Sequence, residues 1–226
     1  MKRIIVLLGI LAVLVCALFL IFDLTNVRAP FSMQQQGDTI SITTASLEEN
    51  TDVYSMDAQY PQFGISSIDA QIQKAVEAAA QDIRSAPANP PDSAVEQNTL
   101  QGSFDKIYAG ADYISVELAL SEYTGGAHPS TDYVGMVFDR KTGSELTLND
   151  ALSLTGLTLA QLSVEATSDL QKQLGEEFQF PEGASADPQN FQSFVVDQKS
   201  VTFIFEQYQV AAYAAGVQYV SIPRLK

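Results

Sequence analysis

The stretch Ser121-Glu-Tyr-Thr-Gly-Gly-Ala-His-Pro-Ser130 decides how the middle of this sequence is interpreted. It separates two segments with strand-like patterns and contains the only histidine in 226 residues. Gly125 and Gly126 can adopt positive φ without steric cost, and Pro129 pushes His128 towards an extended conformation. The stretch therefore predicts a sharp corner between two strands.

On both sides of this corner apolar and polar residues alternate with the two-residue period of a half-buried strand. The same pattern recurs more weakly near both ends of the chain, which predicts a sheet built mainly from antiparallel neighbours. The strand-like segments are Thr39–Thr43, Val53–Ala58, Tyr113–Leu120, Val134–Phe138, Glu145–Leu148, Phe191–Val196 and Val201–Phe205.

Two segments have helical spacing. Apolar residues recur every three or four positions from Ile68 to Ile83, with Ser66 and Asp69 as a candidate cap. The second segment begins with the Thr158/Gln161 capping box and stops at Gly175, and Asn149 is a candidate cap for a shorter helix. We therefore expect an α+β fold in which an antiparallel sheet packs against two main helices.

The segment Ile4–Phe22 contains nineteen apolar residues and no charge. At about 1.5 Å per residue, a helix of this length reaches roughly the ~30 Å thickness of the hydrocarbon core. Lys2 and Arg3 precede it and Asp23 follows it, so the positive-inside rule places residues 1–3 in the cytoplasm. This predicts a single-pass protein of the cell membrane whose remaining chain is extracytoplasmic.

This segment has two other interpretations. A cleaved signal peptide could end at Val27-Arg-Ala29, but its apolar region would normally be only ~7–15 residues long, and Pro30 disfavours cleavage. A lipid attachment at Cys16 is disfavoured because Val15 stands where a small residue is needed. An uncleaved signal anchor is therefore favoured.

Composition predicts the organisation of the rest. Residues 23–37 are typical of a tether, residues 38–95 of a small hairpin-plus-helix module, and residues 96–226 of a larger α+β domain. The proline-rich segment Ser85–Ser93 suggested the internal boundary.

The chain has a net charge of −15, which disfavours binding to nucleic acid or to an anionic membrane face. Its single cysteine lies in the apolar segment, and one histidine is too few for a usual zinc site. No phosphate-binding loop, dinucleotide-binding glycine pattern or Gly-x-Ser-x-Gly elbow is present. We therefore expect no metal and no cofactor.

The segment Tyr123-Thr-Gly-Gly-Ala-His-Pro129 resembles the motif of the extracellular domain shared by RsiV-type anti-sigma factors and PdaC-type peptidoglycan deacetylases. Tyr60–Phe63, Asn149–Leu152 and Phe205–Pro223 add to this resemblance, which covers Glu96–Lys226 well and the preceding module more faintly. It implies an α+β domain in the bacterial cell envelope. RsiV-type domains bind lysozyme, and PdaC-type proteins carry a separate deacetylase domain.

We expect neither the anti-sigma nor the deacetylase role here, because residues 1–3 are too short to bind a sigma factor and no deacetylase domain follows. The predicted function is a non-catalytic, membrane-anchored binding module for a peptidoglycan fragment or another cell-wall glycan, or for a basic wall-lytic protein such as lysozyme. Its oligomeric state is not predicted. The candidate ligand-binding residues are Tyr123, Gly125, Gly126, His128, Pro129, Tyr208 and Tyr213.

The alternative is an envelope hydrolase or deacetylase-related enzyme in which His128 is the catalytic base. It would activate Ser121 or Ser130, with Asp132 orienting the imidazole. A structural histidine bonded to backbone in the turn is the simpler interpretation.

Overall fold

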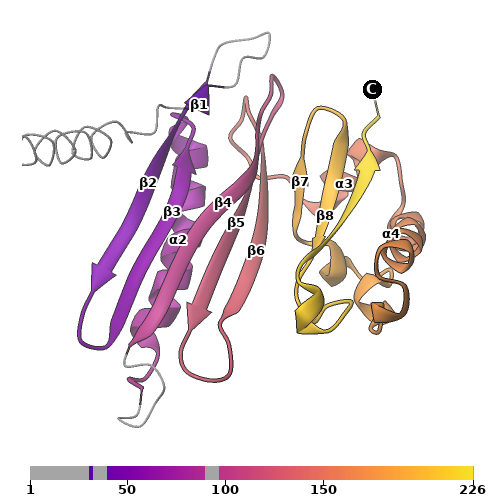
Figure 1. Ribbon diagram of the computed structural model, residues 1–226. Helices are drawn as coiled ribbons and strands as arrows, with labels where there is room; N and C mark the ends of the chain where they lie inside the picture. The colour runs from indigo at the N-terminus through magenta and orange to yellow at the C-terminus, as the bar shows by residue number, and fades with distance from the viewer. Residues whose placement is uncertain (1–30, 33–39, 90–96, 226) are drawn as a thin grey trace, which may run out of the picture. The chain divides into compact units, whose positions relative to one another are not determined.

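The computed structural model describes residues 31–32, 40–89 and 97–225 (Figure 1). The chain divides into two compact units, Met1–Phe31 and Ser32–Lys226, and all but one of the described residues lie in the second. The helices are α2 (Ser66–Ser85), α3 (Leu148–Thr155) and α4 (Leu159–Leu174). The strands are β1 (Phe31–Ser32), β2 (Ser41–Asn50), β3 (Tyr54–Gln62), β4 (Asn98–Ala109), β5 (Tyr113–Tyr123), β6 (Ser130–Asp139), β7 (Phe194–Val196), β8 (Ser200–Phe205) and β9 (Gln218–Pro223).

Strands β2 to β6 lie side by side in chain order in the larger sheet (Figure 1). The pairs β2/β3, β4/β5 and β5/β6 are antiparallel, whereas β3 and β4 are parallel. A parallel pair needs a crossover connection, and α2 supplies it. The helix packs on one face of the sheet, and the apolar side chains of that face form a core with it.

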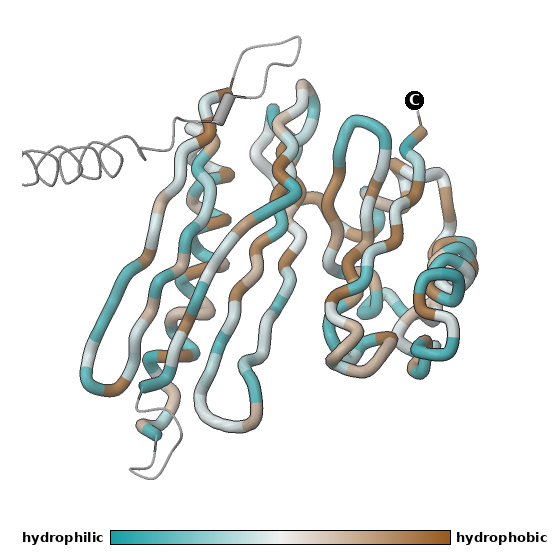
Figure 2. The backbone as a smooth tube through the Cα atoms, viewed as in Figure 1, coloured by the Kyte–Doolittle hydropathy of each residue, from teal (hydrophilic) through white to brown (hydrophobic). Residues whose placement is uncertain are grey.

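Helix α2 buries one aliphatic stripe against the inward side chains of this sheet. Ile68, Ile72 and Ile83 are fully buried in one cluster with Leu118 and Phe138 of the strands. Figure 2 shows the apolar positions recurring along α2 and along the strands, as the two periodicities require. Burial of large aliphatic side chains, at about 1.5–3 kcal/mol each, therefore drives this layer to form.

The start of α2 differs from the expected cap. Ile65 occupies the N-cap position without a side-chain hydrogen bond, so Ser66 is not the cap. Asp69 instead accepts a hydrogen bond from the Phe63 backbone N–H at 2.7 Å, which fixes the chain just before the helix.

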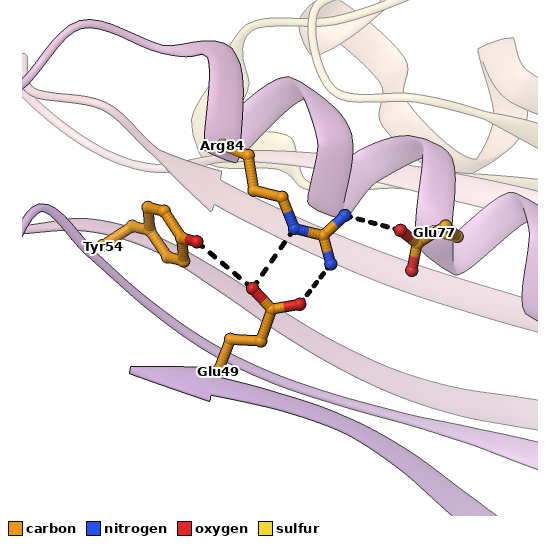
Figure 3. A network of polar contacts seen from close by, with 4 residues as sticks. All are labelled: Glu49, Tyr54, Glu77 and Arg84. Atoms are coloured by element: carbon orange, nitrogen blue, oxygen red, sulfur yellow. Dashed lines mark hydrogen bonds and ion pairs between the residues drawn. The ribbon is translucent and has the colours of Figure 1, made fainter. Parts of the chain in front are cut away.

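The end of α2 is fastened to β2 by Arg84 (Figure 3). Its guanidinium binds the Glu49 carboxylate through two nitrogens and Glu77 at 2.5 Å, and Tyr54 donates to Glu49 at 3.2 Å. The hydrogen bonds that Arg84 donates to the Glu49 and Glu77 carboxylates raise the pKa of its guanidinium. The three side chains are partly exposed to solvent, which screens their charges, so the cluster contributes little to stability.

The smaller sheet, β7-β8-β9, forms a second core with α3 and α4. Phe191 packs edge-on against Phe203 and Phe205, with ring centroids 5.7 and 5.6 Å apart. The two sheets meet directly, since a Cβ atom at Gly135 of β6 would collide with the backbone of Phe194. Ser115 of β5 accepts a hydrogen bond at 3.0 Å from a backbone N–H of β7.

The predicted α+β class with an antiparallel-rich sheet and packing helices is confirmed. The Thr158/Gln161 capping box and the stop at Gly175 also form. For α3 the cap is Thr147, boxed with Asp150, rather than Asn149. Strands β4 and β9 were not predicted. The predicted strand Glu145–Leu148 is wrong: only Glu145 forms an isolated bridge, to Phe138, because α3 begins at Leu148.

The predicted membrane segment Ile4–Phe22 and most of the predicted tether 23–37 lie outside the described residues, as does the boundary between 95 and 96. The strands on the two sides of that boundary, β3 and β4, pair within one sheet. None of the helices in the described ranges is at once long and apolar enough to cross a membrane.

Candidate functional site

The corner between β5 and β6 is shaped by two glycines. Gly125 and Gly126 have φ values of 96° and 117°, in the region that glycine occupies at little cost. The Tyr123 hydroxyl donates a hydrogen bond to the Gly126 carbonyl at 2.6 Å, which closes the loop on itself. The backbone turn therefore presents the residues that follow it, His128 and Pro129, in an ordered position.

His128 meets two tyrosines from the connection between β8 and β9. Its ring stacks on Tyr213 at a centroid distance of 4.0 Å and an angle of 24°. The Tyr213 hydroxyl donates to the Pro129 carbonyl at 3.2 Å, and the Tyr208 hydroxyl lies 3.5 Å from His128 Nε2. His128, Pro129, Tyr208 and Tyr213, here named the corner cluster, thus come together across about 80 residues of sequence.

Tyr208 is held in an unusual conformation. Its φ is 68°, which is uncommon for a residue other than glycine, and 58% of the residue is exposed. Packing explains this arrangement poorly, because more than half of the residue's surface is exposed. Strained residues of this kind concentrate at functional sites.

The hydrogen bonds of His128 do not form a triad. The Nδ1 atom lies 2.8 Å from the Pro129 carbonyl oxygen, and Nε2 faces the Tyr208 hydroxyl. The Ser121 hydroxyl accepts a hydrogen bond from Thr131 at 3.1 Å. Within the described ranges no hydrogen bond joins the imidazole to Ser121, Ser130 or Asp132.

Three carboxylates come from elements next to the corner cluster: Glu122 on β5, Asp132 on β6 and Glu206 directly after β8. Burial and repulsion by Asp132 raise the pKa of Glu206, which accepts a hydrogen bond from the Tyr133 backbone N–H at 3.3 Å. Burial and repulsion by Asp132 and Asp82 raise the pKa of Glu122. The Asp132 carboxylate is therefore close enough to Glu122 and Glu206 to repel them. The described part of the chain contains no group of three or more His, Cys, Asp or Glu side chains arranged to hold a metal ion.

A second polar cluster was missed by sequence reasoning. Lys106 donates to Glu117 Oε1 at 3.0 Å and lies 3.8 Å from the centre of the Tyr219 ring, and Tyr219 donates to the same oxygen at 3.2 Å. Glu117 is only 4% exposed, and its Oε2 atom has no hydrogen-bond partner among the described residues. The sequence carries no local signal for this cluster, because Glu117 occupies a polar position in the alternation of β5.

The structure brings four of the predicted site residues together in the corner cluster. Tyr123, Gly125 and Gly126 belong to the loop that carries His128 and Pro129. Among the described residues, none of these three forms a hydrogen bond with Tyr208 or Tyr213. The positions are therefore compatible with one surface site, although the ligand contacts assigned to these residues stay predictions.

Comparison with known protein families accounts for most of this chain. The model described as "Deacetylase PdaC" matches residues 47–131, and the model described as "Protein of unknown function (DUF3298)" matches residues 153–224. The chain carries a PdaC domain followed by a DUF3298 domain. The family resemblance expected from Tyr123–Pro129 is thereby confirmed.

Several curated proteins are similar to this PdaC/DUF3298 chain over part of their length. The immunogenic protein MPT64 of Mycobacterium tuberculosis is 25% identical over 137 residues, which are 61% of this chain and 60% of that protein. Peptidoglycan-N-acetylmuramic acid deacetylase PdaC of Bacillus subtilis is 22% identical over 191 residues, 81% of this chain and 40% of the deacetylase. An esterase of M. tuberculosis is 29% identical over 111 residues, 49% of this chain and 48% of the esterase.

Two solved structures of DUF3298 family members have the same fold. The protein from Bacteroides fragilis superposes with a TM-score of 0.51 at 16% identity, covering 81% of this chain and 91% of its own. The protein from Pseudomonas aeruginosa gives a TM-score of 0.53 at 18% identity, covering 82% and 91%.

Proposed function

We propose that this PdaC/DUF3298 chain is a non-catalytic binding module of the bacterial cell envelope, anchored to the membrane by Ile4–Phe22. The observation that carries the proposal is the corner cluster. It presents an exposed, strained tyrosine, Tyr208, beside the stacked pair of His128 and Tyr213. The loop that carries His128 is closed by the hydrogen bond between Tyr123 and Gly126.

The chemistry of the cluster suits two ligands found in the envelope. Aromatic rings with a polar edge offer a flat amphipathic surface, to which a sugar ring of a wall glycan can bind. The carboxylates of Glu122, Asp132 and Glu206 near the cluster, with the net charge of −15, would attract a basic wall-lytic protein such as lysozyme. The cell-envelope setting is supported by the two domains and by the peptidoglycan deacetylase among the relatives.

An envelope hydrolase that uses His128 is the second candidate, because the relatives include a deacetylase and an esterase. It would require a nucleophile within hydrogen-bond reach of His128, and the imidazole instead faces Tyr208 and Pro129. Assays of the pure chain with peptidoglycan and with a p-nitrophenyl ester measure this directly. If the chain hydrolyses either substrate and His128→Ala abolishes that activity, the chain is an enzyme and the proposed non-catalytic binding function is wrong.

The binding function is tested by titrating the purified full-length chain with lysozyme and with soluble peptidoglycan fragments. We expect binding of at least one of them, and Tyr208→Ala should weaken it about tenfold because an exposed aromatic anchor is removed. Val164→Ala is the matched control, since Val164 is 68% exposed on α4. The proposal fails if neither ligand binds, or if both variants bind as the original chain does.

A further inference from the structure

The face of the larger sheet opposite α2 carries a polar trough. A hollow of about 380 Å³ lies over β3, β4, β5 and β6. Its lining side chains alternate with those that contact α2, as the pleat of a strand requires. Among its lining residues Gln59, Gln101 and Ser103 are exposed, and Ala119 is half-buried. This surface lies outside the corner cluster.

The polar residues of the trough stand in register across four strands. Asp57 pairs with Gln101, Gln101 with Ser121, and Ser121 with Thr131, so one continuous polar row crosses the sheet. A second row runs beside it from Ser103 through Ala119 to Tyr133. With strands about 4.8 Å apart, the row spans about 14 Å, which suits an elongated ligand.

Most hydrogen-bonding groups in the trough are not used by the protein. Thr131 donates to Ser121 at 3.1 Å. The side-chain amides of Gln59 and Gln101 form no hydrogen bond with any other described residue. Each amide offers donors and an acceptor, and each is held on a rigid strand rather than on a loop. The trough thus presents oriented donors and acceptors to a ligand.

The charge of the trough selects the kind of ligand. Asp57 is the single carboxylate among the described lining residues, and none of those residues is a lysine or an arginine. An anionic polymer would require cations, and a basic protein would be drawn to the more acidic surface near Glu122 and Glu206. A neutral molecule rich in hydroxyl and amide groups matches the lining. Tyr133 at one end adds a flat amphipathic ring.

We propose that this trough, formed by Asp57, Gln59, Gln101, Ser121, Thr131 and Tyr133, binds a neutral saccharide chain. The inference rests on the proposed envelope-binding function and, of its two ligands, selects the wall glycan. The pair Ser121/Thr131 is followed along the hairpin by Glu122/Ser130, and the loop that carries His128 comes next. A saccharide in the trough can therefore extend towards the corner cluster, and the two sites would hold successive sugars of one chain.

Isothermal titration of the full-length chain with soluble oligomers of N-acetylglucosamine tests the trough. The double variant Gln59→Ala/Gln101→Ala should bind about tenfold more weakly, because hydrogen bonds to two amides are lost. Its thermal unfolding should be unchanged, since both side chains are exposed and form no hydrogen bond with another described residue. Gln81→Ala is the matched control, because it removes an exposed amide from α2 on the other side of the sheet. A polyuronate should not compete with the oligomers.

The outcomes separate the trough from the proposed function. If Gln59→Ala/Gln101→Ala binds the oligomers more weakly and Gln81→Ala binds them as the original chain does, the trough is the saccharide site. Unchanged affinity in the trough variant, with loss in Tyr208→Ala, overturns the trough and leaves the corner cluster as the binding site. Absence of any oligomer binding overturns the trough as well, while lysozyme binding in the earlier titration would preserve the envelope function without it.

Discussion

Lys106 and Tyr208 are the two residues other than glycine that have positive φ in the described part of the chain, at 48° and 68°. The first lies where the register of β4 against β5 shifts between Asp105 and Tyr108. The second lies in the connection between β8 and β9. Such conformations cost of the order of 1–3 kcal/mol each and persist only where the surroundings enforce them.

The two positions differ in what offsets this cost. The bulge aims the Lys106 ammonium at Glu117 and at the face of Tyr219, so an otherwise unpaired buried carboxylate gains a cation. Tyr208 gains a hydroxyl contact of 3.5 Å with His128 and a tilted ring contact of 5.5 Å with Tyr213, and 58% of it stays exposed. The strain at Lys106 is thus explained by the fold, whereas the strain at Tyr208 points to a ligand.

Removing the Lys106 side chain should have the largest effect on stability. In Lys106→Ala the Glu117 carboxylate stays buried with Tyr219 as its remaining partner, and we expect unfolding to become easier by about 3 kcal/mol. Chemical denaturation followed by circular dichroism measures this loss. The control is Arg84→Ala, which removes a cation from two more exposed carboxylates and should cost about 1 kcal/mol or less.

The double variant Lys106→Met/Glu117→Leu sharpens this test. Replacing both charges by apolar side chains removes the unpaired carboxylate, so most of the lost stability should return. If the double variant is as unstable as Lys106→Ala, the loss of stability comes from the changed bulge and not from the unpaired Glu117 carboxylate.

Exchanging Tyr208 should have a smaller effect and a different pattern. Glycine tolerates a φ of 68° and alanine does not, so Tyr208→Gly should be more stable than Tyr208→Ala by about 1 kcal/mol. Both should lose ligand affinity equally, because both lack the ring. Thermal unfolding and titration of the two variants measure this, and equal stability would mean that Tyr208 is not strained.

The parts of the fold that follow from burial were readable from the sequence. The alternation from Ile114 to Leu120 and the stripe from Ile68 to Ile83 predict β5 and α2 because each buries one apolar face. Strand β4 was hidden, since Gly102 and the bulge at Lys106 interrupt its alternation. Gly102 is required there because a Cβ would lie 2.7 Å from that of Ala58.

The candidate site was readable only in part. Glycine, proline and a lone histidine mark the loop around His128 by local chemistry. The stacking of Tyr213 on that histidine depends on how the β8–β9 connection meets the β5–β6 corner, which no local pattern encodes. Glu117 has the sequence position of a solvent-facing residue of β5, and only the second sheet, through Tyr219, makes it buried.

The smallest expected effect concerns the acidic surface beside Tyr208. Burial and the Asp132 charge raise the pKa of Glu206 above its ordinary value of 4.5, so the folded chain binds more protons than the unfolded chain in the window just above that value. Stability therefore falls as the pH rises through this window. The same sign applies to Glu122.

Asp132→Asn removes the repulsion from both glutamates but leaves their burial. We expect a gain of about 0.5 kcal/mol or less at pH 7, no gain near pH 4, and a smaller gain in high salt, because the groups are partly exposed. Unfolding titrations between pH 4 and pH 7 measure how the free energy of unfolding changes with pH. Asp105→Asn is the control, because it removes one exposed charge elsewhere. If the free energy of unfolding depends on pH equally in the two variants, Asp132 does not repel Glu122 and Glu206. The surface beside the corner cluster would then lack the concentrated negative charge on which attraction of a basic protein depends, and a neutral saccharide would be the better ligand for both sites.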